Sequence, residues 1–397
     1  MKKLREIPRF YIDIFFLFAA EVLWAIGSNM YMGQLSVYMN GIVHDPRLVS
    51  FIQSIANFSG ILAIFGGFLT RRVNLKWLVV LCWAVTVPAP LLFALAQDAF
   101  LLILGQSIYS LTTMFGPAVI LYIFDYDYPT DKLRVYLLYC LVSQIASVTG
   151  PAIGGTVATA LGMRGMLMIV FVLFTLASLS TLAMSKAVGK AQPEPLPKRS
   201  ERAPFSLREH LKAYGTLYGW MLLFVLLPAI ETVAEPLISV YLTDHRGFTT
   251  AQIGYGFTLT CLGGVLLTMT VRKWGKSVPI LAVMALLSAL FAAADLGFMG
   301  TGFALMLCML TLRGAARTTV FFEQGTFTEL SETAGPHKGM FVSAFIALRS
   351  LAMTAANNLG GVLYTRSPTA PFAAELLGCA VWLAAFALFF MRQRKKA

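Results

Sequence analysis

The chain has 397 residues, a formal net charge of +12, 58% hydrophobic residues and only 13% charged residues. A basic chain can indicate a nucleic-acid-binding protein. Here, however, the basic residues lie in short gaps between long apolar stretches, where they orient a membrane protein and meet anionic lipid headgroups. The composition excludes a soluble globular domain and argues against nucleic acid as a partner.

Twelve apolar stretches follow one another along the chain, each close to the roughly 20 residues that a helix needs to cross a bilayer. The sequence therefore predicts an all-α polytopic membrane protein with 12 transmembrane helices. We interpret the basic start as the flank of a first span rather than a signal peptide, because the apolar stretch is long and contains Asp13 and Glu21. The predicted spans are 11–39, 48–70, 75–96, 100–124, 135–161, 163–184, 217–242, 249–271, 278–299, 303–322, 340–364 and 372–391.

The basic residues predict the topology. Of the 31 Lys and Arg residues, 24 lie at the two termini or in the gaps after even-numbered spans, and only four lie in the other gaps. The positive-inside rule then places both termini in the cytoplasm. Cysteine usage and the short loops favour a bacterial inner membrane, and we expect a monomer that contacts membrane lipids.

Enzyme chemistry finds little support in the sequence. The five cysteines are scattered through the spans, and the four histidines lie in or near loops without zinc-like spacing. Gly275-Lys276-Ser277 ends like a phosphate-binding loop, but Thr270 occupies the position of its first glycine. We expect no cofactor, no metal and no enzyme activity.

A polar segment with four prolines divides the chain in its middle. It predicts an N-terminal six-helix bundle at 1–185, a cytoplasmic linker at 186–212 and a C-terminal six-helix bundle at 213–397. Patterns recur about two hundred residues apart: Ser36-Val37-Tyr38 returns as Ser239-Val240-Tyr241, and Gly154-Gly155 returns as Gly360-Gly361. Such a repeat predicts two pseudo-symmetric bundles.

Three motifs carry a family resemblance. Residues 150–155 read Gly-Pro-Ala-Ile-Gly-Gly, 127–134 contain an Asp-x-Pro segment followed by Arg134, and 67–76 form a basic loop. With them the chain resembles the major facilitator superfamily over essentially its whole length. The first motif is similar to the G-P-x-x-G-G element often associated with proton-coupled antiporters. The loop departs from G-x-x-x-D-R-x-G-R-K, because Arg71 replaces the Asp and Asn74 replaces the second Gly.

The resemblance implies secondary transport by alternating access. It also implies that the family's inter-helix charge latch differs here, with Arg71 and Arg72 as candidate conformational residues. Gly150, Pro151 and Gly154 are candidates too, because a G-x-x-x-G pair lets helices approach closely and proline loosens the helix. Two interpretations stay open for this element: plain helix packing, or a bending and sealing point between the halves.

Carboxylates inside spans are expensive and therefore informative. Glu21 lies near the middle of the first span, and Glu231 and Glu235 lie four residues apart on one predicted face of the seventh, between Pro228 and Pro236. Glu21 resembles an acidic residue of some multidrug–proton antiporters of this family. A carboxyl group in a low-dielectric cavity can exchange a proton near physiological pH, so these three residues are the candidates for proton coupling. The alternative is a structural ion pair with Arg313 or Arg349.

Four other acids fall near predicted span ends, where long side chains reach water cheaply. Asp13, Asp295, Glu323 and Glu375 are therefore not singled out as candidates. Polar side chains on the expected cavity helices are substrate-binding candidates, with interhelical hydrogen bonding as the alternative. The substrate-binding candidates are Asn29, Tyr31, Gln34, Asn57, Gln144, Arg313, Arg349 and Asn357.

The sequence is compatible with three functions. The first is proton-coupled export of an amphipathic or cationic small molecule, which rests on Glu21, Glu231 and the Gly-Pro element. The second is proton-coupled uptake or exchange of an anionic or sugar-like solute, for which Arg313, Arg317 and Arg349 would supply charge. The third is lipid flipping or a non-transporting receptor. The partners expected are a small-molecule substrate and protons.

Overall fold

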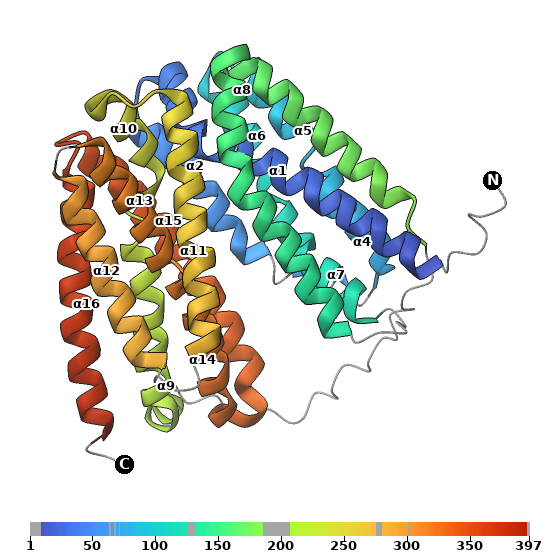
Figure 1. The fold of residues 1–397 in the computed structure, drawn as a ribbon. Coiled ribbons are helices and arrows are strands. Elements are labelled where there is room, and N and C mark those ends of the chain that lie inside the picture. Colours follow the sequence, from blue (N-terminus) through green and yellow to red (C-terminus); the bar gives the residue numbers. More distant parts are fainter. Residues whose placement is uncertain are drawn as a thin grey trace. The chain divides into compact units, whose positions relative to one another are not determined.

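The computed structural model describes residues 9–62, 65–66, 69–70, 72–125, 132–185, 207–274, 280–300 and 302–394. Within these ranges the chain is helical and contains no strand (Figure 1). Eight helical stretches are long and apolar enough to cross a membrane, and two shorter apolar helices accompany them. Arg71, the Asp-x-Pro segment and most of the predicted linker lie outside the described residues.

The twelve predicted spans are confirmed, although several consist of two helical pieces. In chain order they are α1 (Arg9–Val43); α2 (Pro46–Phe58) with η2 (Ser59–Leu62); α4 (Leu75–Ala84) with α5 (Pro88–Leu95); α6 (Ala99–Ser110) with α7 (Thr112–Asp125); the two arms of α8 (Lys132–Leu182); α9 (Leu207–Ile230) with η3 (Glu235–Leu237) and α10 (Ile238–Arg246); α11 (Thr250–Trp274); α12 (Ile280–Phe298); α13 (Phe303–Ala316) with α14 (Thr319–Leu330); α15 (Lys338–Tyr364) after η4 (Ser331–His337); and α16 (Ala370–Arg394).

Local sequence explains where these helices break and begin. Gly162, with φ of 72°, separates the two arms of α8, because this left-handed conformation suits glycine. Pro228 and Pro236 flank the break between α9 and α10. Asn74, which departs from the family loop pattern, caps α4 by accepting a hydrogen bond from the backbone N–H of Lys76 at 2.9 Å.

Contacts divide the chain into two units. The first comprises Met1–Glu194 and Ser239–Thr258, and the second comprises Pro195–Ile238 and Leu259–Ala397. The end of the seventh span and the start of the eighth are thus grouped with the first unit. The bundle boundaries that the sequence predicts, at 185 and 213, stay a prediction.

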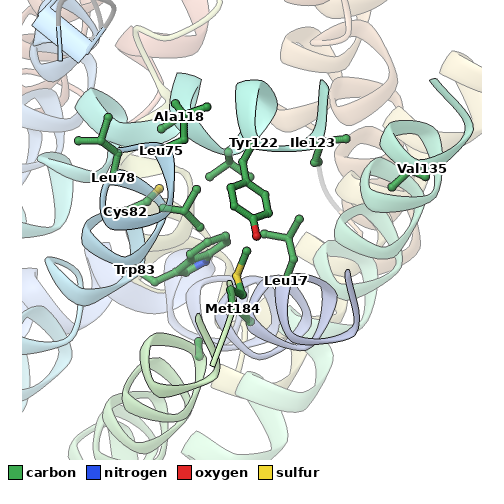
Figure 2. Close-up of a cluster of buried hydrophobic side chains, with 14 residues drawn as sticks. Leu17, Leu75, Leu78, Cys82, Trp83, Ala118, Tyr122, Ile123, Val135 and Met184 are labelled. Atoms are coloured by element: carbon green, nitrogen blue, oxygen red, sulfur yellow. The ribbon is translucent and has the colours of Figure 1, made fainter. Parts of the chain in front are cut away.

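The core of the first unit forms where α1, α4, α7 and α8 meet. Figure 2 shows Leu17 of α1, Trp83 of α4, Tyr122 of α7 and Val135 of α8 in one buried cluster. Because lipid tails are as apolar as these side chains, the packing itself rather than removal from water holds such helices together. Leu17, a member of this cluster, lies one helical turn before Glu21 on α1. Packing of Leu17 in the cluster therefore fixes the orientation of the helix face that carries Glu21.

Asp13 is buried, which contradicts the expectation that it reaches water at a span end. Its carboxylate accepts hydrogen bonds from the backbone N–H of Ser185 at 2.9 Å and from the Ser185 hydroxyl at 2.5 Å. Lys76 donates to the carbonyl of Leu182 at 2.9 Å. These hydrogen bonds satisfy polar groups at the end of α8. The buried side chains of Asp13 and Lys76 therefore stabilise that helix end.

Glycines let helices meet backbone to backbone at equivalent places in the two units. A Cβ atom on Gly154 of α8 would lie 1.9 Å from the carbonyl oxygen of Met30, and one on Gly360 of α15 would lie 1.7 Å from that of Val233. Met30 belongs to the first span and Val233 to the seventh, so the repeat seen in the sequence returns as a repeated contact. This agrees with two pseudo-symmetric bundles.

We predict that Gly154→Ala destabilises the protein, because the new methyl group cannot coexist with the Met30 carbonyl unless α1 and α8 separate. Such overpacking costs about 1–3 kcal/mol. Thermal melting of the purified protein measures the effect. Gly41→Ala on α1 is the matched control, since a Cβ there meets nothing within 4 Å. Equal melting temperatures for the two variants would contradict the close approach.

Candidate functional site

A cavity of about 330 Å³ lies within the first unit, and Glu21 is part of its wall. Helices α1, α4, α7 and α8 all contribute side chains. The aromatic ones are Trp24, Trp83, Tyr136 and Tyr139, and the others are Cys82, Thr112, Thr113, Gly116, Val119 and Ile120. The described lining thus combines one carboxylate with four aromatic rings and includes no basic side chain.

Glu21 is held by a neutral partner. It is 4% exposed, and the Tyr139 hydroxyl of α8 donates a hydrogen bond to its Oε2 atom at 2.5 Å. Within α1, Leu17 and Ala20 next to it are fully buried. Elsewhere in the lining, the Thr112 hydroxyl donates to the Cys82 carbonyl at 2.7 Å and so joins α7 to α4.

This chemistry suits a proton or an organic cation. A carboxylate neutralises a cation, and aromatic faces attract one through the ring quadrupole. Among the described residues, no group of three or more metal-ligating side chains is placed to hold a metal ion. The cavity therefore offers one exchangeable charge in apolar surroundings.

Other predicted binding residues of α1 lie farther along the same helix. Tyr31 packs its ring against Phe93, Tyr109 and Phe174, at centroid distances of 6.0–6.5 Å. Asn29 donates to the Ala25 carbonyl and to the Ser147 hydroxyl. These two residues are interhelical contacts. Their role in binding stays a proposal.

Gln34 is the most suggestive of the remaining polar candidates in the first unit. It is buried, and neither its amide oxygen nor its amide nitrogen has a hydrogen-bond partner among the described residues. A buried amide without a partner costs free energy, so a polar ligand group would stabilise it. Asn57 is half-buried and Gln144 is exposed. The structure gives no contact that brings Asn57 or Gln144 to the cavity.

In the second unit, Arg313 of α13 is the centre of a buried charge cluster. It is 1% exposed and makes a bidentate pair with Glu375 of α16, with N···O distances of 2.8 and 3.0 Å. Its guanidinium also pairs with Asp295 of α12 and lies 4.3 Å from the centre of the Phe291 ring. Both acidic partners are fully buried. Arg313 is thus committed to internal ion pairs.

The break in the seventh span is tied to this cluster. Glu375 accepts a hydrogen bond from the backbone N–H of Ala234 at 2.8 Å, and Arg313 donates to the carbonyl of Glu231 at 3.3 Å. These bonds satisfy backbone groups that lose helical partners where α9 ends. The charges therefore stabilise an interrupted helix inside the membrane.

The expectation that Glu231 and Glu235 share one helix face is wrong, because α9 ends at Ile230 and the next helical piece, η3, begins only at Glu235. The Glu231 carboxylate is buried and accepts from the Thr319 hydroxyl at 3.1 and 2.9 Å. Glu235 is 28% exposed and pairs with Arg317. The two carboxylates therefore differ in surroundings: Glu231 accepts from a neutral hydroxyl, whereas Glu235 lies beside the two arginines Arg317 and Arg313.

The expectation that Asp295, Glu323 and Glu375 reach water at span ends is also wrong, since each is fully buried. Depth along a helix does not determine which way a side chain points. A sequence signal did exist: the second half carries several intramembrane acids and three intramembrane arginines, and charges in such places pair with one another. Arg349 is half-buried, and Asn357 is buried with no partner for its amide oxygen among the described residues.

Comparison with known proteins agrees with this architecture. A family model described as Major Facilitator Superfamily matches residues 17–327. No curated protein sequence matches the chain significantly.

Solved structures resemble the chain over nearly its whole length. A mutant of the nucleoside transporter NupG is 14% identical with a TM-score of 0.74, covering 95% of this chain and 99% of that one. A mutant of the peptide transporter POT in complex with sulfate is 16% identical with a TM-score of 0.75, covering 96% and 94%. A bacterial homolog to the human lysosomal transporter Spinster, inward-facing and unoccupied, is 14% identical with a TM-score of 0.65, covering 96% and 95%. At these identities the likeness shows the fold alone.

Proposed function

The chain belongs to the Major Facilitator Superfamily, and we propose that it exports an amphipathic or cationic small molecule in exchange for protons. The fold supports secondary transport of a small solute through a multi-pass membrane protein. The direction, the coupling ion and the class of solute are our proposal.

The observation that carries the proposal is the Glu21 cavity. Its described lining contains a single carboxylate, four aromatic residues and no basic side chain. An anionic solute would meet the Glu21 charge without a counter-charge, whereas an organic cation would gain both the ion pair and the aromatic faces. The volume of about 330 Å³ matches the low end of the range of small-molecule pockets.

A shared carboxylate would enforce exchange. If Glu21 binds either a proton or the cation, each ligand lowers the affinity for the other, and the linkage is reciprocal. A proton entering from outside would then displace the cation outward once the halves rock from one state to the other. In this scheme Glu231 and Glu235 are further candidates for proton binding in the second unit.

The setting of the transporter is proposed from the charge pattern. We place the chain in a bacterial inner membrane with both termini in the cytoplasm, as a monomer in contact with lipids. The Gly150–Gly155 element would serve as a sealing surface: a Cβ on Gly155 would lie 3.1 Å from the Cα of Gly254 in α11, so the two backbones touch.

A second candidate function is transport of an anionic or polar solute such as a nucleoside or peptide, the solutes named for the similar structures. Arg349 favours it, because its Nε atom has no hydrogen-bond partner among the described residues. Arg313 argues against it, since internal carboxylates already hold its guanidinium.

Transport into proteoliposomes with an imposed pH gradient distinguishes these functions. The probes are tetraphenylphosphonium, a nucleoside, a dipeptide, a sugar and a fluorescent lipid. The proposal expects tetraphenylphosphonium to accumulate against its gradient on the acidic side and the other probes to stay at the level of empty liposomes. Gradient-driven movement of any other probe without movement of the cation would overturn it.

We also predict that Tyr139→Phe weakens tetraphenylphosphonium binding at neutral pH by about tenfold or more. A hydrogen bond donated to a carboxylate favours the ionised form that binds a cation, and such a bond to a charged group contributes about 1.5–3 kcal/mol. Quenching of tryptophan fluorescence measures binding. Tyr136→Phe, which alters the same cavity wall, is the control and should bind as the wild type does. Equal weakening by both variants would remove the Tyr139 hydrogen bond from the explanation.

A further inference from the structure

The second unit contains more intramembrane acid than base. Its described spans bring together five carboxylates, and the arginines whose charges act on them are Arg313, Arg317 and Arg349. Four of the five carboxylates are buried, namely Glu231, Asp295, Glu323 and Glu375, and Glu235 is 28% exposed. If all eight groups were ionised, the cluster would carry two uncompensated negative charges. Buried charge without a partner is strongly disfavoured, so some of these carboxyl groups must hold protons.

The contacts show which of these carboxylates lack an arginine to neutralise their negative charge. Glu235 pairs with Arg317 and also lies 3.9 Å from Arg313, so its charge is compensated. Asp295 and Glu375 share Arg313, which leaves one excess carboxylate in a tightly packed set whose members also fix the backbone of the seventh span. The remaining carboxylates are Glu231 and Glu323. The charges of Arg313 and Arg317 act on Glu231, whereas Arg349 is the arginine whose charge acts on Glu323.

Glu323 has the least support of all. It lies on α14, is fully buried, and neither carboxylate oxygen has a hydrogen-bond partner among the described residues. Thr319, one turn earlier on α14, donates to Glu231 and so holds that carboxylate on the same side of the helix. The charges of Glu231 and of Arg349 on α15 both act on Glu323.

We propose that Glu323 is a proton-binding carboxyl group of the transport cycle, with Arg349 as the counter-charge that decides whether the proton stays. This deepens the proposed function, on which it rests, by adding Glu323 to the proton-binding candidates Glu21, Glu231 and Glu235. A proton from water binds a carboxylate oxygen of Glu323 and leaves the group neutral. When Arg349 pairs with Glu323, the ionised form is favoured and the proton returns to water.

A proton-binding role of Glu323 differs from a structural ion pair between Glu323 and Arg349. A structural pair needs both partners charged at all times, and removing one leaves the other buried alone. A proton site is neutral in at least one state of the protein. Replacing Glu323 by glutamine then imitates that state, so the protein keeps its stability while it loses one exchangeable proton.

Infrared difference spectroscopy of the substrate-free protein in detergent tests the proposal, because a protonated carboxyl group has a carbonyl stretch that an ionised one lacks. Relative to the wild type at pH 7.5, Glu323→Gln should lose one component of this band and keep its melting temperature. Arg349→Gln should show more of the component that Glu323→Gln lacks. Glu329→Gln, which changes an exposed residue of the same helix, should match the wild type in both measurements.

Two results would overturn the proposal. One is a protonated-carboxyl band identical in the wild type, Glu323→Gln and Arg349→Gln. The other is a lowered melting temperature in both single variants that the double variant Glu323→Gln/Arg349→Gln restores, since that pattern belongs to a structural ion pair. If Glu323→Gln does not fold, the test rests on Arg349→Gln. A stronger protonated-carboxyl band than in the wild type supports the proposal, and an unchanged band contradicts it. No substrate is present in these measurements, so their outcome is separate from cation transport through the Glu21 cavity.

Discussion

Arg313→Gln should lower the stability of the protein by about 3–5 kcal/mol, the largest loss that we expect from a single substitution. The change leaves Asp295 and Glu375 fully buried without their arginine, and it also removes the hydrogen bond to the Glu231 carbonyl where the seventh span breaks. Thermal melting in detergent measures the effect.

The matched control is Arg317→Gln. Arg317 is 30% exposed and pairs with Glu235, which is 28% exposed, so its loss should cost about 0–1 kcal/mol. Neutralising all three members of the buried set, by Arg313→Gln with Asp295→Asn and Glu375→Gln, should recover most of the stability lost by the single change. Equal melting temperatures for Arg313→Gln and Arg317→Gln would contradict the central place of Arg313.

Glu21→Gln should abolish proton-driven accumulation of tetraphenylphosphonium in proteoliposomes while the protein stays folded. Glutamine keeps the size of the side chain and can still bond with Tyr139, but it can neither release a proton nor neutralise a cation. Because the hydrogen-bond partner of Glu21 is a neutral hydroxyl, the substitution leaves no partner charge behind at that contact.

The control measurements separate coupling from folding. The melting temperature of Glu21→Gln should equal that of the wild type, and a neutral substrate should still move down its own gradient. Asp98→Asn keeps a cap on α6 and should accumulate the cation as the wild type does. A stable Glu21→Gln protein that still concentrates the cation against a gradient would remove Glu21 from the coupling mechanism.

The sequence predicted the spans well because the bilayer sets their length and apolarity. The register of the repeat was also visible, since Gly154 and Gly360 occupy equivalent contacts against Met30 and Val233. Prolines at 228 and 236 indicated a distortion of the seventh span. The extent of the break was not predictable, because it depends on Glu375 and Arg313, which reach it from other helices.

The buried acids show the limit of reasoning from position along a span. Asp13 and Glu375 lie near span ends, as expected, yet both turn inward and accept hydrogen bonds from backbone N–H groups. Which face of a helix meets another helix depends on packing between distant segments. Charge counting is the better guide for such residues, because acids and arginines inside one half of a membrane protein must balance each other or bind protons.

Proton release on cation binding tests the exchange at Glu21 most directly. Tetraphenylphosphonium is added to purified protein in weakly buffered detergent solution, and a pH-sensitive dye reports protons released. We predict that the wild type releases protons in proportion to the cation bound, and that Glu21→Gln releases none. Cation binding to the wild type without proton release, or equal release by Glu21→Gln, would contradict a carboxylate shared by proton and substrate.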